Sequence, residues 1–226
     1  MLTVDYNKLC AGDAIALQQQ LKTQVQLIPL TQPVTTIGGA DISFNKYSET
    51  VYAGIVVLSY PSLEVIDKAA IITQVTFPYI PGLLAFREVP TLAQAWNKLS
   101  VQPNVLVLDG HGIAHPRRMG IATHFGIIAQ TPTIGCAKSL LTGKYSNLGA
   151  NAFDTAPLIS KNETIGVVLR TKAKTNPVFV SPGNLITLEE SVELMKSCVQ
   201  KYRIPTPTRL AHHYVNEVRV AGKVEG

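Results

Sequence analysis

The N-terminal part of the chain has the hydrophobic pattern of one helix followed by three strands. Apolar residues recur at helical spacing at Ala14, Leu17, Leu21 and Val25. Asp13 can cap this helix, and runs rich in Val, Ile and Thr then predict strands over 35–44, 51–59 and 65–76. Because the connections between these strands are short, we expect an antiparallel meander.

The middle of the chain changes to a helical period and then contains a short, wholly apolar run. Residues 83–88 predict a short helix, and Pro90, in a first-turn position, predicts the start of another. The apolar run 105–108 ends abruptly at Asp109, as a central parallel strand does when it delivers a residue at its carboxyl end. Two further elements are expected, a helix over 118–128 and a strand over 133–136.

The C-terminal part is less regular but carries one clear helix start. Thr187 and Glu190 match a capping box, which predicts a helix that ends near Lys201. The other expected elements are strands over 165–170 and 177–180 and a last helix from about Thr208.

The order of these elements defines the expected fold class. Periodicity alone supports an α/β protein whose sheet starts with antiparallel strands. Three strands, helix, strand, helix, strand is the order of the ribonuclease H-like fold, a mixed sheet in which an antiparallel three-strand start is followed by parallel strands, with helices on both faces. The sequence has no internal repeat and no linker long enough to divide it, so we expect a single domain over 1–226.

The composition indicates a class of protein but says little about its function. With 46% hydrophobic and 15% charged residues, the chain is globular rather than disordered. Its 20 Lys and Arg against 15 Asp and Glu give a net charge of +5, which attracts polyanions but is common in proteins that bind no nucleic acid. Three widely spaced cysteines, no secretory signal and no plausible membrane span predict a cytoplasmic protein.

Two of the carboxylates occupy positions that are costly for a charge. Asp41 lies inside the first predicted strand, and Asp109 ends the most apolar one. A divalent cation held by oxygen ligands would offset the cost of burial, but so would an arginine partner or, for Asp109, a helix N-cap bond. Taken alone, Glu88 and His212 are typical of surface groups on helices. Lys138 follows a predicted strand and could reach a phosphate.

Two segments combine residue types that suit nucleic acid. Residues 109–118 contain two glycines, which let a ligand approach the backbone, and histidines and arginines, which suit phosphate contacts. A solvated turn before a basic helix start is the alternative, whereas a dinucleotide loop is excluded because His115 stands where G-x-G-x-x-G needs glycine. Residues 78–82 form a rigid, proline-flanked turn, in which Tyr79 could wedge between stacked bases or pack against the surface.

These segments, in this order, resemble the endonuclease V family of DNA repair nucleases over about residues 34–215. The matching residues are Gly39-Ala40-Asp41, Leu58 to Glu64, Pro78 to Gly82, Phe86-Arg87-Glu88, Asp109 to Gly112, His115 to Arg118, His124-Phe125-Gly126, Pro132 to Gly135 with Lys138, Asn176-Pro177 and Pro205 through Arg209. Each match alone is weak, but the spaced set is specific.

The resemblance implies an activity, a cofactor and a partner. The family recognises deaminated adenine, which is hypoxanthine in DNA, and some members prefer inosine in RNA. It nicks the second phosphodiester bond 3′ to the lesion, leaving 3′-hydroxyl and 5′-phosphate ends. The implied cofactor is Mg²⁺, for which Mn²⁺ can substitute, and the implied partner is DNA that contains deoxyinosine, bound by a monomer.

The resemblance also implies roles for the acidic residues. Asp41 and Asp109 would ligate the metal, and Glu88 would complete or support the site. Lys138 would help to orient water and phosphate. His212 falls where the family has a histidine or an aspartate near the metal.

A second set of residues is expected to contact the substrate. Tyr79 would be the wedge that holds the flipped base out of the helix. The others are Pro78 and Ile80 beside the wedge, Gly82, Leu84, Gly112, His115 and Gly120 at the base pocket, and Arg117 and Arg118 on phosphates.

Three alternatives are open. A nucleic-acid-binding protein of the same fold with a dead site is disfavoured by the intact Asp41, Glu88 and Asp109, because binding gains nothing from three convergent anions facing phosphate. A junction resolvase or ribonuclease H-type enzyme would carry the same acids, but the turn over 78–82 makes it a poorer match. Within the family, an inosine-specific endoribonuclease is the alternative.

Overall fold

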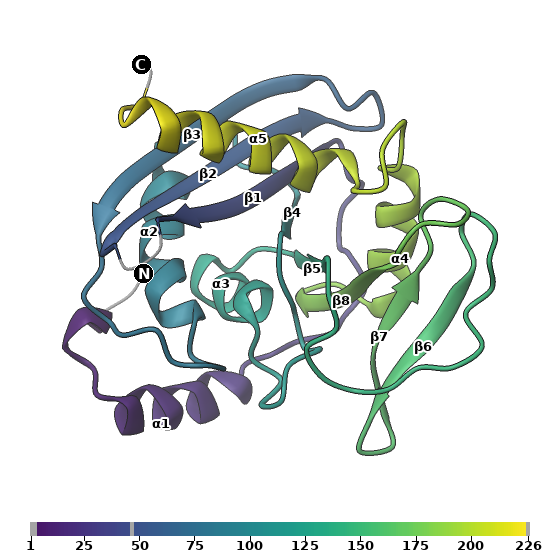
Figure 1. Ribbon diagram of the computed structural model, residues 1–226, viewed down its shortest axis with the longest axis horizontal. Coiled ribbons are helices and arrows are strands. Elements are labelled where there is room, and N and C mark those ends of the chain that lie inside the picture. Colours follow the sequence, from purple (N-terminus) through teal and green to yellow (C-terminus); the bar gives the residue numbers. More distant parts are fainter. Residues whose placement is uncertain (1–3, 46–47, 225–226) are drawn as a thin grey trace.

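One mixed sheet of eight strands, with helices on both faces, makes up the part of the chain that the computed structural model describes, residues 4–45 and 48–224 (Figure 1). The strands are β1 (Thr36–Phe44), β2 (Thr50–Ser59), β3 (Val65–Gln74), β4 (Val105–Leu108), β5 (Thr133–Ala137), β6 (Thr155–Ser160), β7 (Glu163–Leu169) and β8 (Val178–Asn184). The helices are the 3-10 helix η1 (Tyr6–Lys8), α1 (Ala11–Lys22), α2 (Ala85–Lys98), α3 (Ile121–Ala129), α4 (Leu188–Ser197) and α5 (Thr206–Ala221).

The strand order confirms the predicted fold class. The order is β3-β2-β1-β4-β5-β8-β7-β6, in which β1, β2 and β3 form the antiparallel meander. β4 runs parallel to β1, and β5 runs parallel to β4. The antiparallel strands β8, β7 and β6 then extend the sheet. The sequence pattern missed β6, which contains Pro157 and lies at the edge of the sheet, where a residue without an N–H is tolerated.

Three helix boundaries differ from those predicted. Helix α1 is capped by Cys10 rather than by Asp13, whose carboxylate instead closes a capping box by accepting from the Cys10 N–H. Helix α3 begins at Ile121 because Arg118 has a left-handed backbone (φ 62°) and cannot belong to a helix. Helix α4 starts with the predicted capping box but ends at Ser197, short of the predicted end.

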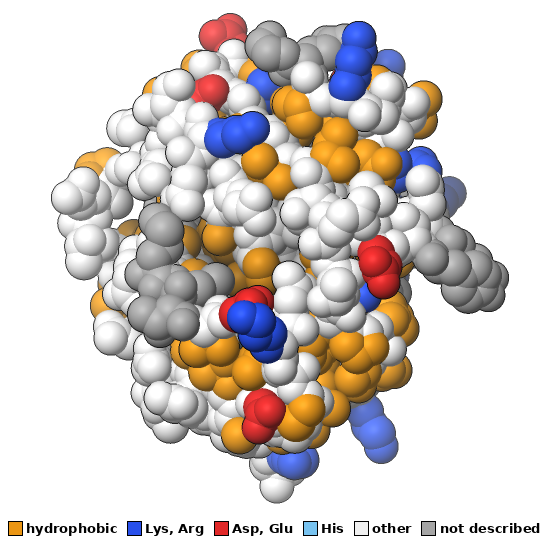
Figure 2. Space-filling view, turned by 90° about the vertical axis from the view of Figure 1, so that its left-hand side faces the viewer, with side chains coloured by type: hydrophobic (Ala, Val, Ile, Leu, Met, Phe, Trp, Pro, Cys, Tyr) orange, Lys and Arg blue, Asp and Glu red, His pale blue; other side chains and the backbone are white. Residues whose placement is uncertain are grey.

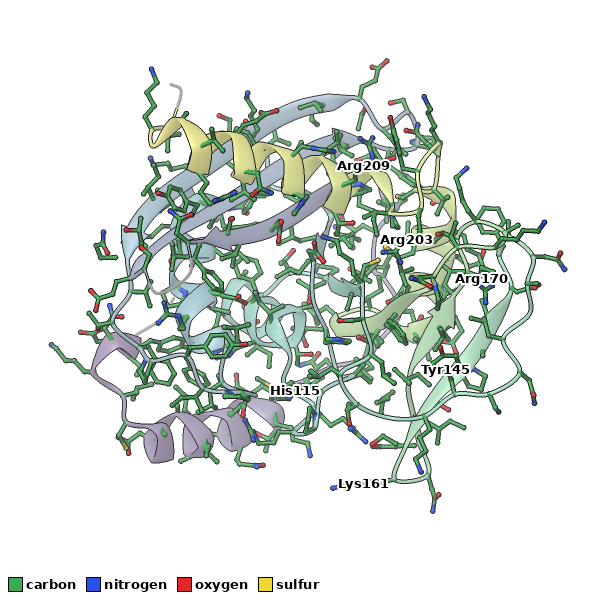
Figure 3. The ribbon with its side chains drawn as sticks, in the orientation of Figure 1. His115, Tyr145, Lys161, Arg170, Arg203 and Arg209 are labelled. Carbon is green, nitrogen blue, oxygen red and sulfur yellow. The ribbon has the colours of Figure 1, made fainter. Side chains whose placement is uncertain are left out.

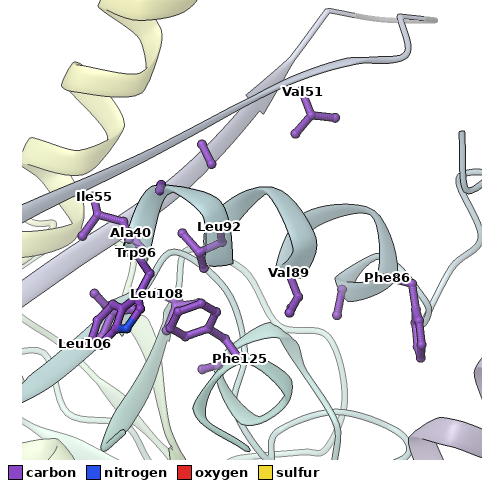
Figure 4. Packing of buried hydrophobic residues seen from close by; sticks show 14 of the residues in the cluster. Ala40, Val51, Ile55, Phe86, Val89, Leu92, Trp96, Leu106, Leu108 and Phe125 are labelled. Atoms are coloured by element: carbon purple, nitrogen blue, oxygen red, sulfur yellow. The ribbon is translucent and has the colours of Figure 1, made fainter. Parts of the chain in front are cut away.

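One continuous helix, α2, replaces the two that were predicted around Pro90. The buried face continues through the proline, with Phe86, Val89, Leu92 and Trp96 all on one side. Figure 4 shows this face packed with Ile55 of β2 and Leu108 of β4. Burial of the continuous apolar face offsets the backbone hydrogen bond that Pro90 cannot donate, so the helix does not break.

The core lies on both sides of the sheet. Residues of α2 and α3 pack on one face, and residues of α4 and α5 pack on the other. In β4 the side chains alternate between these two cores, which explains its wholly apolar sequence. None of the helices in the described residues is long and apolar enough to cross a bilayer.

Helix α5 lies directly on β1 because Gly39 has no side chain. A Cβ at Gly39 would be 1.9 Å from the carbonyl oxygen of Pro207. Asp41 is on the same face of β1, about 6.6 Å further along the strand, and His212 is about 7.5 Å along α5 from Pro207. Because these two distances are similar, Asp41 and His212 lie opposite each other on β1 and α5.

Gly39→Ala should therefore destabilise the protein. The added methyl group has to push α5 away from β1, and overpacking of this kind costs about 1–3 kcal/mol or more. Urea unfolding followed by circular dichroism measures the change. The control is Gly12→Ala in α1, where the new Cβ meets only the Cys10 Sγ at 3.6 Å and should add about 0.5–1 kcal/mol of stability. Equal stabilities for the parent and Gly39→Ala would contradict this account.

Candidate active site

Two aspartates lie next to each other at the C-terminal end of β4. The parallel pairing of β1 with β4 ends at Ala40 and Leu108. Asp41 is the next residue on β1, and Asp109 is the next residue after β4. The Asp109 N–H donates to the Ala40 carbonyl at 3.0 Å, which holds the two backbones together beyond the strand end. The two carboxylates therefore lie side by side at the C-terminal end of β4.

Three other elements bring polar side chains to these aspartates. His212 of α5 places its Nδ1 2.7 Å from Asp41 Oδ2, and Lys138, directly after β5, contacts Asp109 through its Nζ. Glu88 of α2 lines the same small cavity as both aspartates. The structure thus brings together all five residues expected to carry the metal and the chemistry.

The electrostatics of this cluster fit a bound cation. Burial, with the charges of Asp41 and Asp109, raises the pKa of Glu88 to about 8, against the opposing effect of Arg87. Burial and then the charge of Asp109 raise the pKa of Asp41, partly offset by its bond to His212. Ligand atoms of Asp41, Asp109 and His212 lie within 4.8 Å of one another. Crowded carboxylates with one imidazole are a donor set that suits a hard divalent cation.

A pocket of ≈ 330 Å³ opens onto the acidic cluster, since Glu88 and Asp109 form part of its wall. Its size falls within the range of about 300–1,000 Å³ that small-molecule pockets have. Five of the residues expected to contact the substrate line it, namely Tyr79, Gly82, Leu84, His115 and Gly120. A bound group would therefore lie directly beside the acids.

The turn that carries Tyr79 is anchored at one side. Ile80 packs against the core under α2, whereas the Tyr79 side chain is 64% exposed at the pocket. Pro78 is exposed and, like Ile80, is not part of the pocket wall. This arrangement presents an aromatic ring to solvent from a fixed backbone.

Gly112 does not line the pocket. A Cβ there would be 2.1 Å from the Pro182 carbonyl oxygen, so the glycine serves close packing against β8. Its N–H donates to Ser181 Oγ at 2.9 Å, and its carbonyl accepts from the Gly120 N–H. Its backbone groups are therefore bonded within the protein.

The structure places Arg117 and Arg118 in internal hydrogen bonds rather than on an open surface. Arg117 Nη2 donates to the Gly82 carbonyl at 2.6 Å. Arg118 donates from Nη2 to Glu163 Oε2 at 2.8 Å and from Nη1 to the His115 carbonyl at 3.1 Å. The Arg117 guanidinium thus holds the segment before α2 at the pocket wall, and that of Arg118 connects the segment after β4 to the hairpin of β6 and β7.

Several arginine side chains donate to backbone carbonyls within the protein. Arg170 and Arg203, labelled in Figure 3 beside β7 and β8, donate to the carbonyls of Gly149 and Asn176 respectively. On the face shown in Figure 2, Lys and Arg side chains are scattered among apolar, uncharged and acidic ones and form no single patch. Much of the arginine content therefore supports loops.

Sequence reasoning missed several residues of the pocket wall. Leu140 and Leu141 lie shortly after Lys138 in the segment that follows β5, so their place in the sequence could have indicated that they are near the site. His111 stands between two glycines, and its buried Nδ1 has no hydrogen-bond partner among the described residues. Burial lowers the pKa of His111 and of His115 to about 4, so both rings are neutral near pH 7.

Comparison with known proteins agrees with this geometry. A model of the endonuclease V family matches residues 19–213. Endonuclease V of Gloeobacter violaceus is 46% identical over 94% of this chain and 88% of its own. The crystal structure of endonuclease V from Streptomyces avermitilis superposes with a TM-score of 0.90 at 37% identity, covering 94% of both chains.

One similar structure contains nucleic acid. Endonuclease V of Ciona intestinalis, in complex with a 24mer DNA containing an inosine followed by a ribo-adenosine, matches with a TM-score of 0.83 at 29% identity. The match covers 94% of this chain and 98% of that one. With matches of this extent, the chain belongs to the endonuclease V family of metal-dependent nucleases.

Proposed function

We propose that this nuclease recognises hypoxanthine, the product of adenine deamination, in DNA and nicks the second phosphodiester bond 3′ to it, with Mg²⁺ as its cofactor. The observation that carries the proposal is the pocket that shares Glu88 and Asp109 with the acidic cluster. Such a pocket can hold a flipped base while the neighbouring backbone reaches the acids. The inosine-containing DNA bound to the Ciona intestinalis relative supports the same substrate.

The acidic cluster has the groups that phosphodiester hydrolysis needs. Asp41, Asp109 and His212 would hold the Mg²⁺ ion with Glu88 beside it, and the bound ion would polarise the phosphate and lower the pKa of water. Lys138, next to Asp109, brings a positive charge that can stabilise charge developing on the phosphate. The aspartates are held by backbone pairing of β1 and β4, so they need little rearrangement.

Apart from Glu88 and Asp109, the side chains of the pocket wall offer hydrogen bonds rather than charge to the base. Because His115 Nδ1 accepts from the Arg117 N–H at 3.2 Å, the neutral ring carries its proton on Nε2 and can donate from there. Hypoxanthine presents an acceptor at position 6 and a donor at N1, where adenine presents the reverse. The His115 Nε2–H can read that difference, whereas the Gly82 carbonyl and the Gly120 N–H are already bonded within the protein.

We further propose that the chain acts as a monomer and as a single domain over 1–226. The continuous eight-stranded sheet of the described residues supports the second point, since its two halves share the strand pair β5–β8. The site is also assembled from one chain alone.

A nicking assay on matched substrates tests this function. The substrates are a duplex, a single strand and an RNA, each with one inosine and each incubated with Mg²⁺ or with a chelator. We expect both DNA substrates to be nicked only with Mg²⁺. Preferential cleavage of the RNA would favour the endoribonuclease alternative. Binding without cleavage of any substrate would favour a non-catalytic binding protein.

A further inference from the structure

A glutamine on α1 connects two walls of the base pocket. Gln18 is buried, with 1% of its surface exposed, and lies outside the pocket wall. Its Nε2 donates to the carbonyl of Gly82 at 3.1 Å and to the carbonyl of Met119 at 3.2 Å. Gly82 precedes α2 and Met119 precedes α3, and both line the pocket. One side-chain amide therefore bridges two segments that both line the pocket.

Arg117 completes the connection. Its Nε donates to Gln18 Oε1, and its Nη2 donates to the Gly82 carbonyl at 2.6 Å. The Gly82 carbonyl thus accepts two hydrogen bonds from behind the pocket. The Nε2 and Oε1 atoms of the Gln18 amide therefore both have hydrogen-bond partners, two for the nitrogen and one for the oxygen.

The backbone at Gly82 depends on this network. Gly82 has φ +81°, and a Cβ there would be 2.6 Å from Arg117 Nη2. A glycine in this conformation has no side chain to hold it, so its orientation is set by what bonds its carbonyl. Figure 3 shows His115 on the side of the molecule where α1 lies, and Arg117, whose N–H donates to His115 Nδ1, belongs to the same network.

Helix α1 is fixed firmly enough to serve as the support. Leu21 packs against Met119 and Ile127 in a small apolar cluster separate from the two main cores. Met119 is therefore held both by apolar packing against Leu21 and by the hydrogen bond from Gln18. A shift of α1 would move both walls of the pocket at once.

We propose that Gln18, together with Arg117, is a positioning residue that sets the separation of the Gly82 and Met119 segments and thereby decides which bases the pocket accepts. This inference rests on the proposed function, because it assumes that the pocket receives the base. Gln18 touches neither the pocket interior nor the acidic cluster. Its loss should therefore reduce discrimination between bases and leave the chemical step in place.

Gln18→Met tests the proposal, since methionine has a similar length and cannot hydrogen-bond to the carbonyls. We expect KM for inosine DNA to rise about tenfold, with kcat changed by about twofold or less, because the lost bonds position the base and not the acids. The ratio of kcat/KM for inosine over adenine substrates should fall about tenfold, on duplexes and single strands alike. Gln19→Met, on the exposed face of the same helix, is the matched control and should match the parent.

A purely structural role gives a different result. Loss of folded protein would lower kcat equally on all substrates and leave the ratio between inosine and adenine unchanged. Gln18→Glu provides a second variant, because it keeps the acceptor for Arg117 and loses the amide donors. A folded variant that discriminates as the parent does would overturn the proposal, and so would a failure of both variants to fold. Failure of the proposed function would show separately, as a parent protein that does not nick inosine DNA.

Discussion

Asp109→Asn should lower the rate of nicking at inosine by at least about a thousandfold while leaving the affinity for inosine DNA within a few-fold of the parent. The amide keeps the shape of the carboxylate but removes its negative charge, so it weakens the metal site and leaves the pocket intact. Asp41→Asn should behave in the same way, because both side chains offer ligand atoms to one point. Single-turnover nicking and gel-shift binding measure the two quantities.

Metal binding can be followed without activity. A ligand that binds only the folded state raises its melting temperature, so Mg²⁺ should stabilise the parent and have a smaller effect on Asp109→Asn. Glu189→Gln removes one negative charge from an exposed position on α4 and should keep both the Mg²⁺ effect and full nicking. Substantial nicking by either aspartate variant would show that these residues are not the ligands.

Tyr79→Ala should weaken binding to inosine duplexes by about ten- to a hundredfold, which corresponds to a stacking contact of about 1–3 kcal/mol. The ring is 64% exposed, so its removal should have little effect on the free energy of unfolding. The loss should be smaller on single strands, where no helix has to be opened. Equilibrium binding to both substrates, with an adenine substrate for comparison, measures the difference.

The matched control for this change is Tyr202→Ala. Tyr202 is another exposed tyrosine, with 49% of its surface accessible, but it packs beside Arg209 and lies outside the pocket. It should bind both substrates as the parent does. If Tyr79→Ala also binds and nicks duplexes and single strands like the parent, the tyrosine is not a wedge and the turn over 78–82 is only structural.

The sequence pattern predicted the part of the fold that depends on local signals. The wholly apolar run of β4 identified a central strand and therefore the special position of Asp109 at its end. The prediction divided α2 at Pro90 and omitted β6, which contains Pro157, because the packing of α2 and the edge position of β6 tolerate prolines that a local pattern treats as breaks. Tertiary contacts decided these two elements.

The support of the base pocket could not be predicted in the same way. Gln18 lies four residues after Ala14 and three before Leu21, so the helical spacing places it on the apolar face of α1, but that spacing does not indicate which backbone groups its amide bonds. Arg117 and Arg118 have the composition of a phosphate-binding pair, yet their partners Gln18 and Glu163 are 99 and 45 positions away along the chain. Contacts at such separations depend on the completed fold, so a single sequence carries no local signal for them.

Mapping the cut on an end-labelled duplex with a single deoxyinosine tests the central claim most directly. With Mg²⁺ the protein should give one product, cut at the second phosphodiester bond 3′ to the inosine, with a 3′-hydroxyl that a polymerase can extend. An otherwise identical duplex with adenine at that position should stay intact, as should the inosine duplex with chelator. Cleavage at many positions, or equal cleavage of the adenine duplex, would contradict an inosine-specific endonuclease.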